Sequence, residues 1–283
     1  MRGDWGRAVR ALLRRRSAAC GGAVVIGVLA VALLAPMVAP HDPVDQDLSR
    51  RMKPPGRPYL LGTDDFGRDI LSRIVWGSRV SLGVAAASIV IGASIGSLVG
   101  FAAGYSGGAP DHALMRAMDI MMAFPTLLLA ITLVTVLGRG VGNLVVAIGV
   151  ANIPQFGRIV RGEVLRIKLF DYVDAARGLG ASHLRIIVRH LLPNVWPTLT
   201  VLMSLRVSVA ILSEASLSFL GLGIRAPAPS WGGMVAEGQK FLLLAPWMSL
   251  VPGLAIMALV LGLNLFGDGL RDALDPRLRA EGT

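Results

Sequence analysis

The chain has 283 residues, of which 54% are hydrophobic and 16% charged, and its formal net charge is +10. This apolar composition, with several long runs free of charge, excludes an ordinary soluble protein, because about 20 apolar residues suffice to cross a membrane. Orientation in a membrane explains the excess of Lys and Arg better than nucleic-acid binding does, since basic residues collect in cytoplasmic segments.

Six membrane-spanning helices are predicted from the apolar runs. The expected spans are residues 18–40, 80–104, 116–137, 141–157, 196–221 and 246–267. The first run is too long for the apolar core of a signal peptide, and no clear small-residue cleavage site follows it. The short segments expected outside hold few basic residues, so both chain ends are expected in the cytoplasm.

The predicted fold class is an all-α integral membrane protein with a single membrane domain. Its expected parts are a cytoplasmic tail 1–17, a first helix 18–40, an extracytoplasmic segment 41–78, a core of five helices 79–267 and a cytoplasmic tail 268–283. Within the external segment, the stretch Asp64 to Trp76 has apolar residues at helical spacing. An amphipathic helix is therefore expected there, capped by Thr63 or Asp64 and lying at the outer membrane surface.

Glycines recur at every fourth position of the second expected span, at Gly92, Gly96, Gly100 and Gly104. This spacing places them on one helix face, where small residues let another helix approach closely in lipid. A helix–helix seam is predicted, with its partner either in this chain or in another subunit. In the third span, Pro125 predicts a kink.

Enzymatic chemistry is not supported by the sequence. A phosphate-binding loop needs Gly-Lys followed by Ser or Thr, and none of the three lysines follows a glycine. No histidine pair has the spacing of a helical zinc site. We therefore expect no metal, cofactor or catalytic residue in this chain, and if ATP drives its function, another polypeptide hydrolyses the ATP.

Two charged residues, Arg206 and Glu214, lie within the fifth expected span, eight positions apart and so on one helix face. Charge inside a bilayer is costly and normally faces a cavity, a partner or water. The pair could line a translocation path or contact a partner subunit. A structural role is equally compatible with the sequence, with Arg206 reaching toward the interface and Glu214 bonded to a neighbouring helix.

The longest inner segment, 158–194, is rich in arginine and has a helix–glycine–helix pattern. Gly180 permits a turn that other residues resist, and Ser182 is placed to cap the second helix. Pro193 is expected to start the return to the membrane. The segment is either a compact element that docks on a soluble partner or an amphipathic connector on the inner leaflet.

The spacing in this segment resembles the signature of permease subunits of bacterial ABC importers, which reads Glu-Ala-Ala, three residues, Gly, nine residues, Ile-x-Leu-Pro. The corresponding positions are Asp174 in place of Glu, Ala175, Ala176, Gly180, His190 in place of Ile, Leu192 and Pro193. The resemblance implies a type I ABC importer permease fold. It also implies that these residues form the coupling helix that sits on an ATPase subunit.

Further segments resemble the second permease of dipeptide, oligopeptide and nickel importers. They are residues 61–69, 104–108, 214–223 and 229–232. This resemblance implies a bacterial inner-membrane complex with a second homologous permease, two ATP-binding cassette subunits that hold ATP and Mg, and an extracytoplasmic binding protein. Peptide is the expected substrate. Nickel chelates or another small solute are the alternative substrates. A stand-alone ion-coupled transporter is a further, less favoured interpretation, because such transporters often contain inverted repeats and this sequence shows none.

The outer loop 223–245 and the helix expected near 64–76 are predicted to help receive the binding protein. Trp231 is the proposed anchor, because tryptophan is enriched at interface hot spots. A role at the membrane interface is the competing interpretation for this residue.

Overall fold

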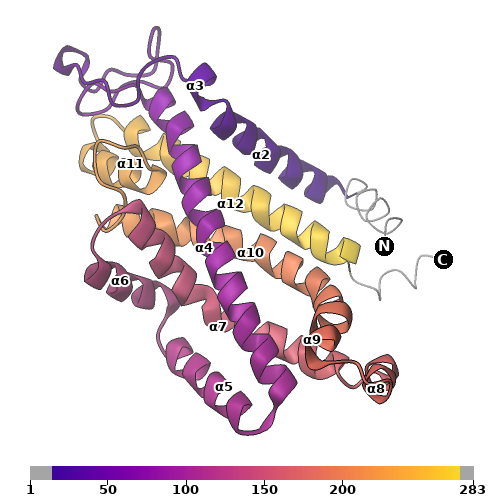
Figure 1. Ribbon diagram of the computed structural model, residues 1–283. Coiled ribbons are helices and arrows are strands. Elements are labelled where there is room, and N and C mark those ends of the chain that lie inside the picture. The colour runs from indigo at the N-terminus through magenta and orange to yellow at the C-terminus, as the bar shows by residue number, and fades with distance from the viewer. Residues whose placement is uncertain (1–14, 275–283) are drawn as a thin grey trace.

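The computed structural model describes residues 15–274 (Figure 1). Within this range every named element is helical, which confirms the all-α class. Five helical stretches are long and apolar enough to span a membrane, or six if one bent pair is counted as a span. The five are α2 (Arg16–Leu33), α4 (Ile70–Ser106), α7 (Val141–Ile167), the stretch His183–Phe219 that ends in α10 (Leu192–Phe219), and α12 (Trp247–Leu274).

The third predicted span is a bent pair of helices. It consists of α5 (Gly108–Met122) and α6 (Thr126–Leu137), which meet at an angle of 88°. Pro125 lies at the break, where it lacks an N–H for the helix ladder and disfavours helical backbone in the residue before it. The prediction of a kink at Pro125 is confirmed, and the bent pair supplies the sixth span if the two helices are counted as one.

The amphipathic helix predicted over Asp64 to Trp76 is also wrong in its first half. The chain turns from 64 to 68, where the Asp64 carboxylate accepts hydrogen bonds from the backbone N–H groups of Phe66 and Arg68, both at 2.9 Å. Helix α4 begins only at Ile70 and continues directly into the second span. Its cap is Asp69, whose carboxylate accepts from the backbone N–H of Ser72 at 3.0 Å.

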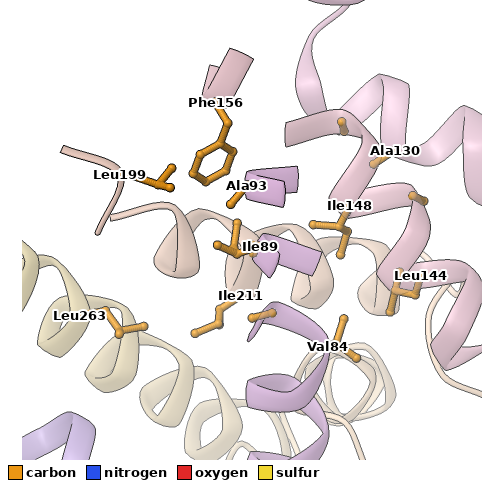
Figure 2. Packing of buried hydrophobic residues seen from close by; sticks show 14 of the residues in the cluster. Val84, Ile89, Ala93, Ala130, Leu144, Ile148, Phe156, Leu199, Ile211 and Leu263 are labelled. Atoms are coloured by element: carbon orange, nitrogen blue, oxygen red, sulfur yellow. The ribbon is translucent and has the colours of Figure 1, made fainter. Parts of the chain in front are cut away.

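The glycine ladder of α4 packs against α7, so the predicted seam exists and its partner lies within this chain. A Cβ atom built at Gly96 would stand 2.6 Å from the Ile153 carbonyl oxygen, and one at Gly100 would stand 2.6 Å from the Gly157 carbonyl oxygen. Figure 2 shows Ala93 beside Phe156 in the core around this seam. Backbones this close leave room for no side chain, which is why glycine occupies the face.

The remaining long helices complete the bundle around α4. Helix α2 packs on α12, and α10 packs against both α4 and α12 (Figure 1). The first predicted span is broken at Leu34, and a short helix α3 (Ala35–Val38) follows α2. Arg15 pairs with Asp272, so the two ends of the described chain lie on the same side of the molecule.

The short elements lie at the two ends of the bundle. They are η1 (Leu48–Arg50), α8 (Asp171–Gly178), α9 (His183–Ile186), a π-helical turn (Ile187–Leu191), α11 (Trp231–Gly238) and η3 (Gln239–Phe241). Helices α7 and α12 both continue beyond their predicted inner ends at residues 157 and 267. The apolar run therefore marks only the part of each helix expected to lie in the hydrocarbon core. It does not mark the helix end, because polar turns can continue the helix into water.

Candidate functional site

Residues 171–190 connect α7 to α10, and we call them the inner knob because the sequence predicts that they lie on the cytoplasmic side. Helix α8 ends in a turn in which Gly180 has φ +77°. The N–H of Ala181 donates to the Ala176 carbonyl at 3.0 Å, and the N–H of Gly180 donates to the Arg177 carbonyl at 2.9 Å. This pair of bonds is a Schellman motif with glycine at its left-handed position. The predicted helix–glycine–helix pattern is therefore confirmed, and Ser182 caps α9 through the N–H of Arg185 as expected.

The knob is fixed to the rest of the molecule by a few buried contacts. Val173 of α8 and Ile186 of α9 are both fully buried in the hydrophobic core cluster. The hydroxyl of Tyr105, near the inner end of α4, lies 2.7 Å from His183 Nδ1 and shares a hydrogen bond with it. These contacts hold the knob against α4 and the hydrophobic core, so it is not a loose loop.

The free side of the knob carries apolar side chains. Leu179 is 89% exposed and Leu184 is 71% exposed, and Tyr172 is also exposed. Figure 1 shows α8 and α9 at the end of the bundle opposite α11. Apolar side chains gathered on a protruding element are typical of a surface that a partner covers.

The residues predicted to couple to an ATPase are all brought together on or beside this knob. Asp174 and Ala175 are exposed on α8, where Asp174 makes a local ion pair with Arg177 at 3.1 Å. His190 lies in the π-helical turn, with its ring 6.1 Å from that of Tyr172. The other members are Ala176 near the end of α8, Gly180 in the turn, and Leu192 and Pro193 in the first turn of α10.

One detail of this segment was predicted wrongly. The return toward the membrane begins at His183, because the helical stretch from there to Phe219 is unbroken. Pro193 follows ten residues later, within the first turn assigned to α10. Proline is tolerated at that place because it directly follows the π-helical turn Ile187–Leu191, where the regular helical hydrogen-bond ladder is already rearranged.

The two charged residues of α10 have different surroundings. The Glu214 side chain is fully buried and accepts hydrogen bonds from the Ser81 hydroxyl of α4 at 2.9 Å and the Ser218 hydroxyl at 2.8 Å. Arg206 is only half-buried, and no hydrogen bond or ion pair joins it to another residue between 15 and 274. The geometry gives Glu214 an internal contact with α4, whereas Arg206 has no hydrogen bond or ion pair within the part of the chain that the structure describes.

Trp231 does not occupy the exposed position that docking requires. Its side chain is 2% exposed, and its indole N–H donates to the Ile74 carbonyl at 2.9 Å. The predicted outer loop contains helix α11, which begins at Trp231 and packs this residue onto α4 at Gly77. The indole thus contributes to internal packing. Its contacts are those of neither a docking anchor nor a membrane-interface anchor.

Sequence reasoning missed a buried ionic cluster at the same end of the bundle, beside α11. The Arg68 guanidinium bonds the Asp64 carboxylate at 2.5 Å and the Glu237 carboxylate at 2.9 Å. Arg73 also reaches Glu237, at 3.2 Å, and both arginines are almost fully buried. These bonds attach the external segment to α11. The clue in the sequence is the alternation of acidic residues and arginines from 64 to 73. On a helix these side chains would point in different directions, whereas a turn brings them together.

Comparison with known proteins identifies the family. The model of the family described as binding-protein-dependent transport system inner membrane component matches residues 96–280. A second model, described as the N-terminal TM domain of oligopeptide transport permease C, matches residues 4–55. The proteins that the chain resembles are transport permeases rather than enzymes.

Several curated relatives match over nearly the whole chain. A glutathione transport system permease protein from Pectobacterium atrosepticum is 41% identical over 99% of this chain and 93% of its own length. Dipeptide transport system permease proteins from Alkalihalophilus pseudofirmus and Haemophilus influenzae are 40% and 42% identical, covering 98% and 94% of this chain and 91% and 92% of their own lengths. The chain therefore belongs to the multi-pass inner membrane components of binding-protein-dependent transport systems.

Proposed function

We propose that this chain is the permease subunit of an ATP-driven ABC importer and forms half of a translocation path for peptides. The other half comes from a second, homologous permease. Two ATP-binding cassette subunits bind and hydrolyse ATP with Mg, and an extracytoplasmic binding protein delivers the substrate. Peptide is favoured over nickel chelates or another solute because the relatives described above carry the names of dipeptide and glutathione transport systems.

The observation that carries this proposal is the inner knob. Its buried side is fixed to α4 and α10, and its free side presents Leu179 and Leu184 to solvent. We infer that an ATPase subunit covers this free side. ATP binding would draw the two ATPases together, move the knobs with them, and switch the spans from inward-open to outward-open.

This arrangement requires the knob and both chain ends in the cytoplasm and residues 41–69 outside. The ion pair between Arg15 and Asp272 supports an even number of crossings between the two ends. The orientation is tested by labelling a single cysteine at Gln46 in intact cells, in a chain whose Cys20 has been replaced. Labelling only after the membrane is ruptured would contradict the orientation.

The coupling role is tested at the glycine turn, where the structure offers a matched control. Gly180→Val forces a β-branched residue into φ +77°, although no atom lies within 4 Å of the new Cβ. Gly180→Asn keeps a residue that tolerates this conformation. Gly178→Ala adds a methyl group two positions away, where neither φ nor space forbids it.

Uptake and substrate-stimulated ATPase activity are measured in the reconstituted complex of two permeases and two ATPase subunits, supplied with the binding protein. We expect Gly180→Val to lose most uptake while Gly180→Asn and Gly178→Ala retain it. Leu179→Ser, which removes exposed apolar surface without touching the fold, should weaken capture of the ATPase subunits, whereas Leu48→Ser on the opposite side should not. Normal uptake by both Gly180→Val and Leu179→Ser would show that the segment is only a connector.

A further inference from the structure

A cavity of about 440 Å³ opens on the outer side of the molecule. Its walls come from the outer end of α10, the segment that follows it, and α11, with Arg139 contributed by the connection between α6 and α7. Helix α11, which supplies part of this lining, lies at the end of the bundle opposite the inner knob (Figure 1). A substrate arriving from outside would meet this part of the chain before the membrane-spanning part.

Positive charge dominates the lining of this cavity. Arg139, Arg225 and Lys240 line it with exposed side chains. None of the three has a hydrogen bond or an ion pair with any residue from 15 to 274. Unpaired cations around one concave surface reinforce each other's potential, because the low-dielectric walls focus the field.

The one acidic residue in the lining does not offset these charges. Glu237 is held by Arg68 at 2.9 Å and by Arg73 at 3.2 Å, two buried guanidinium groups that also pair with Asp64. Arg73 itself also forms part of the cavity wall. The ionic cluster behind the wall thus prevents Glu237 from folding onto Arg139, Arg225 or Lys240, and the cavity keeps a net positive charge.

We infer that this cavity binds the C-terminal carboxylate of an incoming peptide, an inference that rests on the proposed peptide-import function. A carboxylate matches the paired N–H donors of arginine, and Lys240 supplies a third positive charge. Exposed cations bind weakly because water competes with them. Weak binding suits a transport site, from which the substrate must leave again.

A cysteine placed in the cavity reports occupancy there independently of the binding protein's own specificity. Ala228 lines the cavity with an exposed side chain, and the native Cys20 is removed in the same chain. In the reconstituted complex, the labelling rate of Ala228→Cys by a neutral thiol reagent is measured with a tripeptide or with the same tripeptide as its C-terminal amide. Each measurement is repeated with Arg139→Ala and Arg225→Ala together, and with Arg57→Ala as an outer-segment control.

We expect the free-acid peptide to slow labelling of position 228 and the amide to have little effect. Removing Arg139 and Arg225 together should weaken this protection about four- to twenty-fivefold, because each exposed ion pair is worth about two- to fivefold, while Arg57→Ala should leave it unchanged. Equal protection by acid and amide would overturn the inference, as would protection that survives the double substitution. Protection by the ligand-free binding protein and not by peptide would overturn it too, and would assign the cations to protein docking.

Uptake measured in parallel separates the two proposals. A complex that imports the tripeptide with ATP but shows no carboxylate-dependent protection leaves the peptide-import function standing and removes only the carboxylate site. A complex that imports no peptide, although its binding protein and ATPase subunits are assembled, removes both.

Discussion

Gly96 of α4 lies so close to Phe156 of α7 that a Cβ atom at position 96 would stand 2.6 Å from the Phe156 Cβ. Gly96→Ala should therefore push the two helices apart and cost about 1–3 kcal/mol, the range for overpacked interiors. Gly83→Ala is the matched control, because the same helix has open space around Gly83. Thermal unfolding in detergent measures both. Equal unfolding midpoints for the two variants would mean that α4 and α7 accommodate the added methyl group without loss of stability.

Trp231 should stabilise the protein rather than recruit a partner. Trp231→Ala removes a fully buried ring and is expected to cost about 3–5 kcal/mol. Trp231→Phe keeps most of the packing but loses the N–H that donates to the Ile74 carbonyl, for about 1 kcal/mol. Thermal unfolding of the purified chain ranks the variants. Capture of the binding protein should be normal in Trp231→Phe, and a selective loss of capture with normal stability would restore the docking role.

The external segment should show a pH dependence that Asp65 causes. Burial raises the pKa of the Asp65 carboxyl above its ordinary 3.8, and the neighbouring Asp64 carboxylate raises it further. A raised pKa means that the folded state favours the neutral carboxyl. The stability that Asp65 contributes is therefore present below pH 3.8 and is lost as the pH rises through the raised value.

Asp65→Asn removes this loss, so the variant should unfold at a higher temperature than the parent at neutral pH, with a gain that shrinks in acid. Asp47 is expected to change stability with pH in the opposite direction. Hydrogen bonds from the Ser49 hydroxyl and backbone N–H hold the pKa of the Asp47 carboxyl below its ordinary value, so its contribution is present at neutral pH and lost in acid. Unfolding midpoints across the acid-to-neutral range test both. A gain for Asp65→Asn that did not change with pH would contradict this account.

The sequence was most informative where a single local cause decides the structure. The charge-free runs located the apolar parts of the spans, and the four-residue spacing of glycines located the seam of α4. Gly180 and Ser182 predicted the turn and cap of the inner knob, because left-handed backbone and N-capping are properties of one residue and its neighbours.

Predictions failed where distant segments decide the outcome. The periodicity from Asp64 to Trp76 indicated a helix, but the chain turns at 64–68, where Arg68 bonds Glu237 of α11, 169 residues away along the chain. Trp231 was placed in an outer loop because nothing local shows that α11 returns to α4. No spacing rule distinguishes Glu214 from Arg206 either, since Ser81, the partner of Glu214, lies 133 residues away along the chain.

The contrast between Glu214 and Arg206 leads to a prediction that separates internal support from transport. Glu214→Gln can still accept one of the two serine hydroxyls through its remaining oxygen and donate an amide N–H to the other serine oxygen, so assembly and uptake should remain near normal. Glu214→Leu leaves both hydroxyls without an acceptor in a buried site and should cost about 1–3 kcal/mol for each group left unpaired. Arg206 has no partner from 15 to 274, so Arg206→Met should leave the unfolding midpoint unchanged.

The uptake assay then decides what Arg206 contacts. A half-buried guanidinium in a span needs water or a partner, which a translocation path or the second permease would supply. We expect Arg206→Met to reduce uptake several-fold in an assembled complex, and Arg206→Lys to keep most of it because the charge remains. Uptake lost together with assembly would place Arg206 at the second permease, and reduced uptake with normal assembly would place it on the path. Normal uptake by Arg206→Met, with Glu214→Gln impaired instead, would contradict the roles drawn from the structure.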